Sequence, residues 1–155
     1  MASQFSIHNT DFVTKKGSES PRTITGWGRG ATVISIPAIP RYGDQEPGAT
    51  GIYLRSRAAN QGARFPIQLM ANSADAKYFW EQDAIGDVVF SATVTSRDTG
   101  LVTNISNMVI YSIKQFPDIG DGAVGNIEVM LDCERIATDT SKMEVVEPPP
   151  STTGA

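Results

Sequence analysis

Chemically reactive side chains are scarce in this sequence, which holds one cysteine, Cys133, and one histidine, His8. A single thiol cannot form an intramolecular disulfide, so a disulfide-stapled secreted scaffold is excluded and a reducing compartment fits. A two-histidine metal site is impossible, and a catalytic triad would have to use His8, which no nucleophile motif accompanies. Elimination therefore predicts a protein that is not an enzyme, with no catalytic residues, no metal and no cofactor.

Long apolar runs are also missing from the sequence. No window approaches the roughly 20 apolar residues that cross a bilayer. The first residues, Met-Ala-Ser-Gln-Phe-Ser, have neither a basic start nor an apolar stretch, so we expect no signal peptide. The sequence predicts no membrane partner.

Charge is low, at 19% of residues, and unevenly distributed. Residues 1–80 carry nine basic and five acidic side chains, whereas residues 81–155 carry four and twelve. An acidic protein is poorly suited to gripping nucleic acid, because that affinity comes from neutralising phosphates. A positive half and a negative half could attract other copies of the chain, and a role in solubility explains the same charges equally well.

Glycine and proline are plentiful, with 14 and 9 residues in a chain of 155. This composition predicts one all-β domain with many turns, to which the residue pattern discussed below adds a single short helix. We place the domain at residues 1–140. Residues 141–155, which include three consecutive prolines, are expected to be an extended or flexible tail.

A β-meander over residues 86–136 is the clearest predicted structure. Strands are expected at 87–97, 101–114 and 123–136, and Asp98-Thr99-Gly100 provides a hairpin turn. In the third strand, Ile127, Val129, Leu131 and Cys133 form an apolar row. Cys133 there is typical of an inert core thiol.

Acidic side chains occupy the other face of this third strand: Glu128, Asp132 and Glu134. They are either the solvated face of an antiparallel sheet or the lining of a conduit that repels a polyanion such as DNA. Asp118 and Asp121 lie in the preceding glycine-rich loop without the spacing of an EF-hand, so an acidic turn explains them.

Before the meander, strands are predicted at residues 4–15, 22–36, 52–57 and 64–70. Gly26, Gly28 and Gly30 interrupt the second, but their spacing differs from a dinucleotide fingerprint and no helix follows. We expect them to bend the sheet or to allow close approach of another backbone. One helix is expected after Asn72-Ser73, with Asp75 in its first turn and Ala76, Phe79 and Trp80 on one face.

Residues 37–51 form a long excursion with three prolines. The segment is either a floppy loop or one that becomes ordered against a partner. The residues expected to contact that partner are Ile39, Arg41, Tyr42, Asp44 and Glu46.

In this order the elements resemble the tail tube protein of contractile-tailed bacteriophages (myoviruses). The resemblance spans residues 22–136. It rests on the segments Ile24-Thr25-Gly26-Trp27-Gly28, Thr32-Val33-Ile34-Ser35-Ile36, Gly51-Ile52-Tyr53-Leu54-Arg55-Ser56, Arg64-Phe65-Pro66-Ile67-Gln68-Leu69 and Ser73-Ala74-Asp75-Ala76, followed by the meander.

The resemblance implies a β-sandwich or barrel subunit with a flanking helix, related to the ring protein of type VI secretion. Six copies would form a ring whose meander strands join into an inner barrel, and rings would stack into a tube. Phage DNA would pass along a lumen lined by Glu128, Asp132 and Glu134, and residues 37–51 would reach the next ring. Partners would be other copies, the tail sheath and the baseplate, in a virion tail assembled in the host cytoplasm.

Two other functions remain open at this stage. One is another self-assembling component, such as a type VI ring protein or a head decoration protein. The other is a monomeric β-barrel module that binds a peptide or sugar, with Trp27 or Tyr53 in its pocket.

Overall fold

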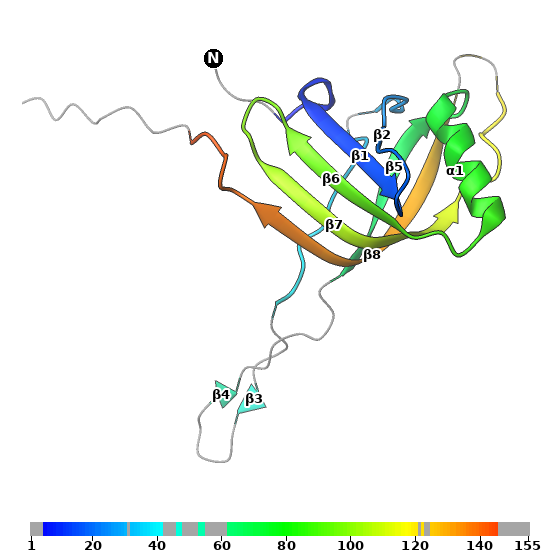
Figure 1. Ribbon diagram of the computed structural model, residues 1–155. Coiled ribbons are helices and arrows are strands. Elements are labelled where there is room, and N and C mark those ends of the chain that lie inside the picture. The colour runs from blue at the N-terminus through cyan, green and yellow to red at the C-terminus, as the bar shows by residue number, and fades with distance from the viewer. Residues whose placement is uncertain are drawn as a thin grey trace, which may run out of the picture.

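A six-stranded antiparallel sheet, with one helix beside it, forms the body of the computed structural model (Figure 1). The structure describes residues 5–30, 32–41, 46–47, 53–54, 62–120, 122 and 125–145. Its elements are β1 (Thr10–Lys16), β2 (Arg22–Thr23), β3 (Glu46–Pro47), β4 (Tyr53–Leu54), β5 (Ala63–Met70), α1 (Ala74–Ile85), β6 (Phe90–Ser96), β7 (Val102–Ile113) and β8 (Asn126–Asp139). A single turn of 3-10 helix, Ile7–Asn9, precedes β1.

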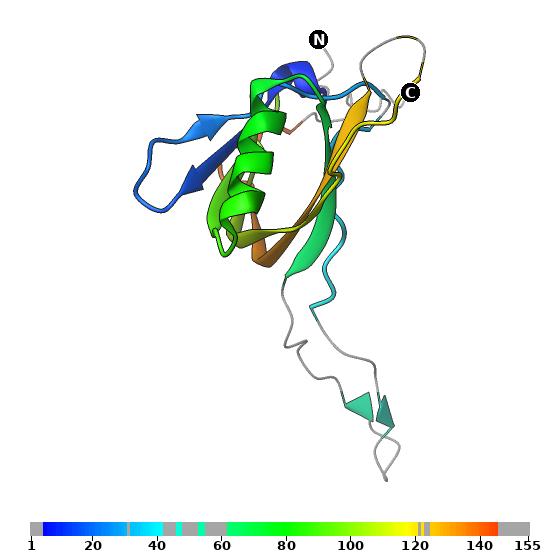
Figure 2. The same ribbon diagram turned by 90° about the vertical axis from the view of Figure 1, so that its right-hand side faces the viewer.

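The strands of the large sheet lie in the order β2-β1-β6-β7-β8-β5. The predicted meander is confirmed as β6, β7 and β8, which are neighbours in the sheet. The sheet is strongly curled, and α1 lies across the open side of the curl (Figure 2). β3 and β4 pair only with each other and stand apart from this sheet (Figure 1). The predicted all-β fold with one helix is therefore confirmed.

The segment after β2 joins the two edges of the sheet. Ile24 N donates to Phe12 O of β1 at 2.9 Å. Farther along, Gly28 N donates to Gln68 O of β5 at 2.8 Å, and Met70 N donates to Gly26 O at 2.9 Å. The curled sheet has the shape of a half-barrel, and this short irregular segment closes it. The segment continues the edge strand β2 along β1 and then pairs with the other edge strand, β5, so fewer backbone groups of β5 remain unpaired.

Two glycines permit this closure. A Cβ atom at Gly26 would lie 2.4 Å from Ser73 Cβ, and one at Gly28 would lie 2.7 Å from the Asn126 amide. The close approach at these two glycines is made by side chains and not by another backbone as predicted, and nothing lies within 4 Å of a Cβ built at Gly30. The predicted strand over residues 22–36 does not resume after Gly30 as expected, because in its described part, residues 32–36, only Ile34 forms an isolated bridge, to Ile67 of β5. The segment meets the edge of β5 at separate points and has no continuous partner there.

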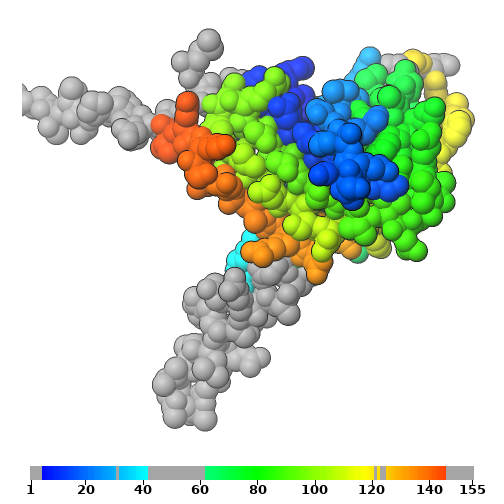
Figure 3. All heavy atoms as spheres, in the orientation of Figure 1, coloured from blue at the N-terminus to red at the C-terminus, as the bar shows by residue number. Residues whose placement is uncertain are grey.

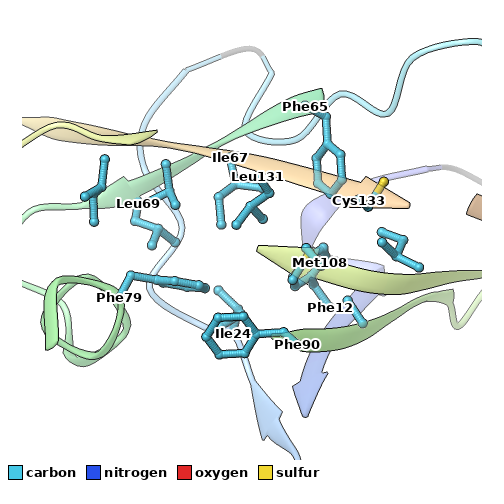
Figure 4. Packing of buried hydrophobic residues seen from close by; sticks show 14 of the residues in the cluster. Phe12, Ile24, Phe65, Ile67, Leu69, Phe79, Phe90, Met108, Leu131 and Cys133 are labelled. Atoms are coloured by element: carbon cyan, nitrogen blue, oxygen red, sulfur yellow. The ribbon is translucent and has the colours of Figure 1, made fainter. Parts of the chain in front are cut away.

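The core lies between the concave face of the sheet and α1. Phe65, Ile67 and Leu69 alternate inward along β5, as the sequence predicts. Phe79 of α1 points toward Phe90 of β6 (Figure 4), with ring centroids 6.2 Å apart. Burial of these side chains is the main stabilising contribution, at about 1.5–3 kcal/mol each.

Helix α1 begins where the sequence predicts, directly after Ser73, and ends at Ile85. The Ser73 hydroxyl accepts a hydrogen bond from Ala76 N at 3.1 Å, and Gly86 follows the last helical residue with a φ of 74°. The helix is also joined to β2, because the Arg22 guanidinium lies 4.6 Å from the Tyr78 ring centre. Figure 3 accordingly shows β1 and β2, in blue, lying between β6 and α1.

Asp75 contributes the most specific contact of α1. Its side chain is buried, and Oδ1 lies 2.9 Å from Arg22 Nε. Oδ2 accepts from Thr25 N at 2.8 Å and Gly26 N at 2.7 Å. The carboxylate therefore ties the helix to the segment that closes the half-barrel.

Candidate assembly surface

The convex face of strands β5, β8 and β7 carries the predicted acidic row. Ile127, Val129, Leu131 and Cys133 of β8 are buried, so Glu128 and Asp132 lie on the opposite face of the strand. Glu134 is also exposed, next to a break in the alternation where Glu134 and Arg135 are both exposed. All three carboxylates are thus accessible, as the alternation predicts.

Neighbouring strands add basic and polar groups to this face. The register of the antiparallel pairs places Arg64 opposite Asp132 and Gln68 opposite Glu128. Arg64 Nη2 lies 3.9 Å from Asp132 Oδ2. On β7, Asn107 donates a side-chain hydrogen bond to Glu134. The acidic row is therefore partly balanced by Arg64 and partly hydrogen-bonded.

An aromatic and apolar strip runs through the same face. The Arg64 guanidinium stacks 3.4 Å from the centre of the Tyr111 ring, a cation–π contact. Tyr111 is 56% exposed. Pro66 and Met130 face each other across β5 and β8 and are partly exposed. The surface can thus offer both charge and stacking contacts, a mixture that the acidic row alone does not predict.

Sequence reasoning missed Arg64 and Tyr111 as members of this surface. The alternation in residues 64–70 places Arg64 on the polar side of its strand. Which strand lies beside it depends on a long-range pairing, and β5 pairs with β8 across more than fifty residues. Tyr111 lies at a register shift between Ile110 and Ser112, which moves it out of the simple alternation.

The second predicted site, the excursion over residues 37–51, is described in part. Ile39 is partly buried against the core, and Arg41 Nη2 donates to Ile136 O at 3.1 Å. A cavity of about 350 Å³ lies beside them, bounded by Thr103, Ile136 and Thr138. Tyr42 and Asp44 lie outside the described residues, and Glu46 belongs to β3, where its backbone pairs with Leu54. The start of the excursion is therefore anchored on the end of β8.

The groups that could carry catalysis are separated in the fold. His8 lies in the turn before β1, while Cys133 is in the middle of β8. Burial raises the pKa of the Cys133 thiol, and Cys133 Sγ lies 3.2 Å from Ala63 O. Among the described residues, His, Cys, Asp and Glu form no group of three that could hold a metal ion. In the same part of the chain, α1 is too short and polar to span a membrane.

Trp27 lines a large cavity at the end of the half-barrel near the N-terminal segment. The volume is about 1110 Å³, and Phe5, Val33 and Ile36 lie on its wall. The rings of Trp27 and Phe12 pack edge to face, with ring centroids 5.8 Å apart and planes at 88°. The indole is thereby packed against the core, and the cavity itself is broad and open to solvent.

This architecture is similar to that of several solved structures, although the sequence itself has no match among family models or curated proteins. Among solved structures, a chain of the anti-feeding prophage baseplate (cryo-EM, 6-fold symmetrised) aligns with a TM-score of 0.62 at 13% identity, covering 89% of this chain and 97% of that one. The chain has the fold of contractile-particle components. The predicted resemblance to contractile tail proteins is confirmed at the level of fold.

Two further structures belong to an extracellular contractile injection system. A chain of its sheath/tube terminator, in the extended state, has a TM-score of 0.60 at 15% identity, with 89% and 99% of the two chains covered. A chain of its sheath-tube complex has a TM-score of 0.55 at 12% identity, with 83% and 87% covered. The likeness spans nearly the whole of each chain, so it concerns the complete fold.

Proposed function

We propose that the protein is a structural subunit of a contractile tail, which assembles with its own copies into stacked hexameric rings that form the inner tube. The observation that carries this proposal is the curled sheet with α1 across its open side, aligned over most of its length with a chain of a sheath-tube complex. The mechanism is mechanical and has no catalytic step. Sheath and baseplate proteins are the proposed outer partners, and phage DNA the proposed cargo.

The proposed lumen lining is the convex face of β5, β8 and β7. Glu128, Asp132 and Glu134 would repel phosphates, while Arg64 would reduce the net charge of each subunit's contribution. A surface of low net charge would bind nucleic acid weakly and allow it to slide.

The orientation of this face is open to a direct test. In a cryo-EM reconstruction of assembled protein, we expect Glu128, Asp132 and Glu134 to point into the lumen. Lys15 and Lys77, on other elements, serve as reference positions outside the proposed lining. Carboxylates located on the outer wall of the tube would contradict the conduit role of this face.

Stacking is proposed to depend on the excursion over residues 37–51. Deletion of residues 42–48 is expected to leave the isolated subunit folded, because the buried core comes from the large sheet and α1. Tubes should be absent and single rings should remain. Circular dichroism would check folding and negative-stain microscopy would check assembly; full-length tubes from this variant would refute the assignment of the loop.

A tube-end or baseplate ring is the second candidate function. The baseplate and terminator chains have higher TM-scores, 0.62 and 0.60, than the sheath-tube chain at 0.55. Microscopy of the purified protein separates the candidates, since a tube subunit gives long tubes and an end component gives isolated rings. A protein that sediments as a monomer at micromolar concentration would instead match a binding module that uses the cavity beside Trp27.

A further inference from the structure

A small cavity lies between the C-terminal end of α1 and strand β7. Its volume is about 210 Å³, and Gln82, Asp83, Asp87 and Val88 lie on its wall together with Val109 and Ile110 of β7. The cavity is separate from the large one beside Trp27. Neither the acidic row nor the excursion accounts for it.

The wall of this cavity contains an unpaired acceptor. Gln82 is 8% exposed, and its Oε1 is buried without a hydrogen-bond partner among the described residues. An unpaired buried polar atom costs about 1–3 kcal/mol, so such atoms are uncommon in native proteins. Because Oε1 itself is closed off from solvent, a donor from outside the subunit would satisfy it only after the Gln82 amide turned toward the cavity.

The electrostatics of the cavity favour a cation. The C-terminal end of a helix carries partial negative charge, and α1 has no basic residue in its last turn. Asp83 and Asp87 add two exposed carboxylates at the same place. The cavity wall, as far as the structure describes it, holds no basic residue, so this end of α1 lacks a positively charged partner.

The apolar part of the wall favours a cation on an aliphatic stem. Val88, Val109 and Ile110 can contact methylene groups while the charged head reaches the carboxylates, as lysine and arginine side chains do. Next to the cavity, Ile85 and Val89 are exposed apolar residues. A pocket flanked by exposed apolar side chains is typical of a protein interface and atypical of a free-ion site.

We propose that this cavity receives a lysine or arginine side chain of a second copy of the chain. The inference rests on the proposed self-assembly and names a contact that would hold the copies together. Charge complementarity supports a second copy, because residues 1–80 carry the basic excess and residues 81–155 the acidic excess. Lys15 and Arg29 are exposed, and no carboxylate lies within ion-pair distance of either in the described part of the chain.

The test compares assembly of the full chain and its variants by sedimentation. Asp83→Lys combined with Asp87→Lys is expected to raise the protein concentration needed for assembly about tenfold or more, because like charges would meet in the pocket. Glu81→Lys is the matched control on the same helix, outside the cavity wall, and should change that concentration less than twofold. Equal assembly by the double variant and the wild type would overturn the inference.

Gln82→Met provides a second measurement that does not introduce charge. It removes the unpaired acceptor at similar volume, so the isolated subunit should melt at a higher temperature. Assembly should nevertheless require a higher concentration, because the donor from the second copy loses its acceptor. A variant that melts at a lower temperature and assembles normally would show that Gln82 has an internal role and would overturn the proposal. A wild-type chain that stays monomeric would refute the proposed function itself.

Discussion

Replacement of Asp75 by alanine is expected to lower the free energy of unfolding of the isolated subunit by about 3–5 kcal/mol. The Asp75 side chain is 4% exposed and its carboxylate pairs with Arg22 at 2.9 Å. The variant would leave the backbone N–H groups of Thr25 and Gly26 without their acceptor. Urea unfolding, followed by the fluorescence of Trp27 and Trp80, measures the loss.

Asp118→Ala is the matched control for this experiment. Asp118 Oδ1 lies 2.8 Å from Lys114 Nζ, a distance similar to that of the buried pair, yet the Asp118 side chain is 90% exposed. Exposed ion pairs contribute about 0–1 kcal/mol, so this variant should unfold nearly as the wild type does. A loss below 1 kcal/mol for Asp75→Ala would show that the buried carboxylate does not hold α1 to the closing segment.

The two roles of Asp75 show where prediction from sequence stops. Its position in the first turn of a helix follows from the cap at Ser73 and the apolar spacing of Ala76 and Phe79, and the structure confirms that helix. The partners of the carboxylate lie about fifty residues earlier in the chain. Local patterns carry no information about such a contact, because it depends on how the segment after β2 returns to β5.

The same limit applies to the candidate assembly surface. Alternation along β8 correctly separates Glu128 and Asp132 from the buried row. It does not reveal that Arg64 lies beside Asp132, because the register between β5 and β8 is set by packing of both strands on the core. Neighbouring strands together determine the charge of a sheet face. The sequence of one strand reveals only the charged side chains that this strand places there.

Irregular pairing explains why the predicted strand over residues 22–36 does not resume in residues 32–36. The β-branched residues Val33 and Ile34 favour a strand, and each does make one backbone contact with β5. A regular ladder would need the segment to run along β5, yet close contacts at Gly26 and Gly28 already fix its path at Ser73 and Asn126. Tertiary contacts here override local propensity.

Replacement of Phe79 by alanine is expected to destabilise the isolated subunit by about 3–5 kcal/mol. Phe79 is completely buried, and it points into the core toward Phe90 and Leu69 (Figure 4). Its removal leaves a cavity between helix and sheet and weakens the cover over the open side of the curl. Unfolding in urea, at a protein concentration below that of assembly, isolates this effect from subunit contacts.

Phe116→Ala makes the same chemical change at a side chain that is 66% exposed. Surface substitutions away from special contacts usually change stability by less than about 0.5 kcal/mol, so this variant sets the baseline. If both variants lost the same stability, α1 would not be packed on the sheet as the ring contact between Phe79 and Phe90 indicates. If only Phe79→Ala unfolds at a lower urea concentration, the curled sheet depends on its helix for stability. The convex face proposed for assembly then depends on the same packing, because the core that Phe79 completes holds β7 and β8 in their curvature.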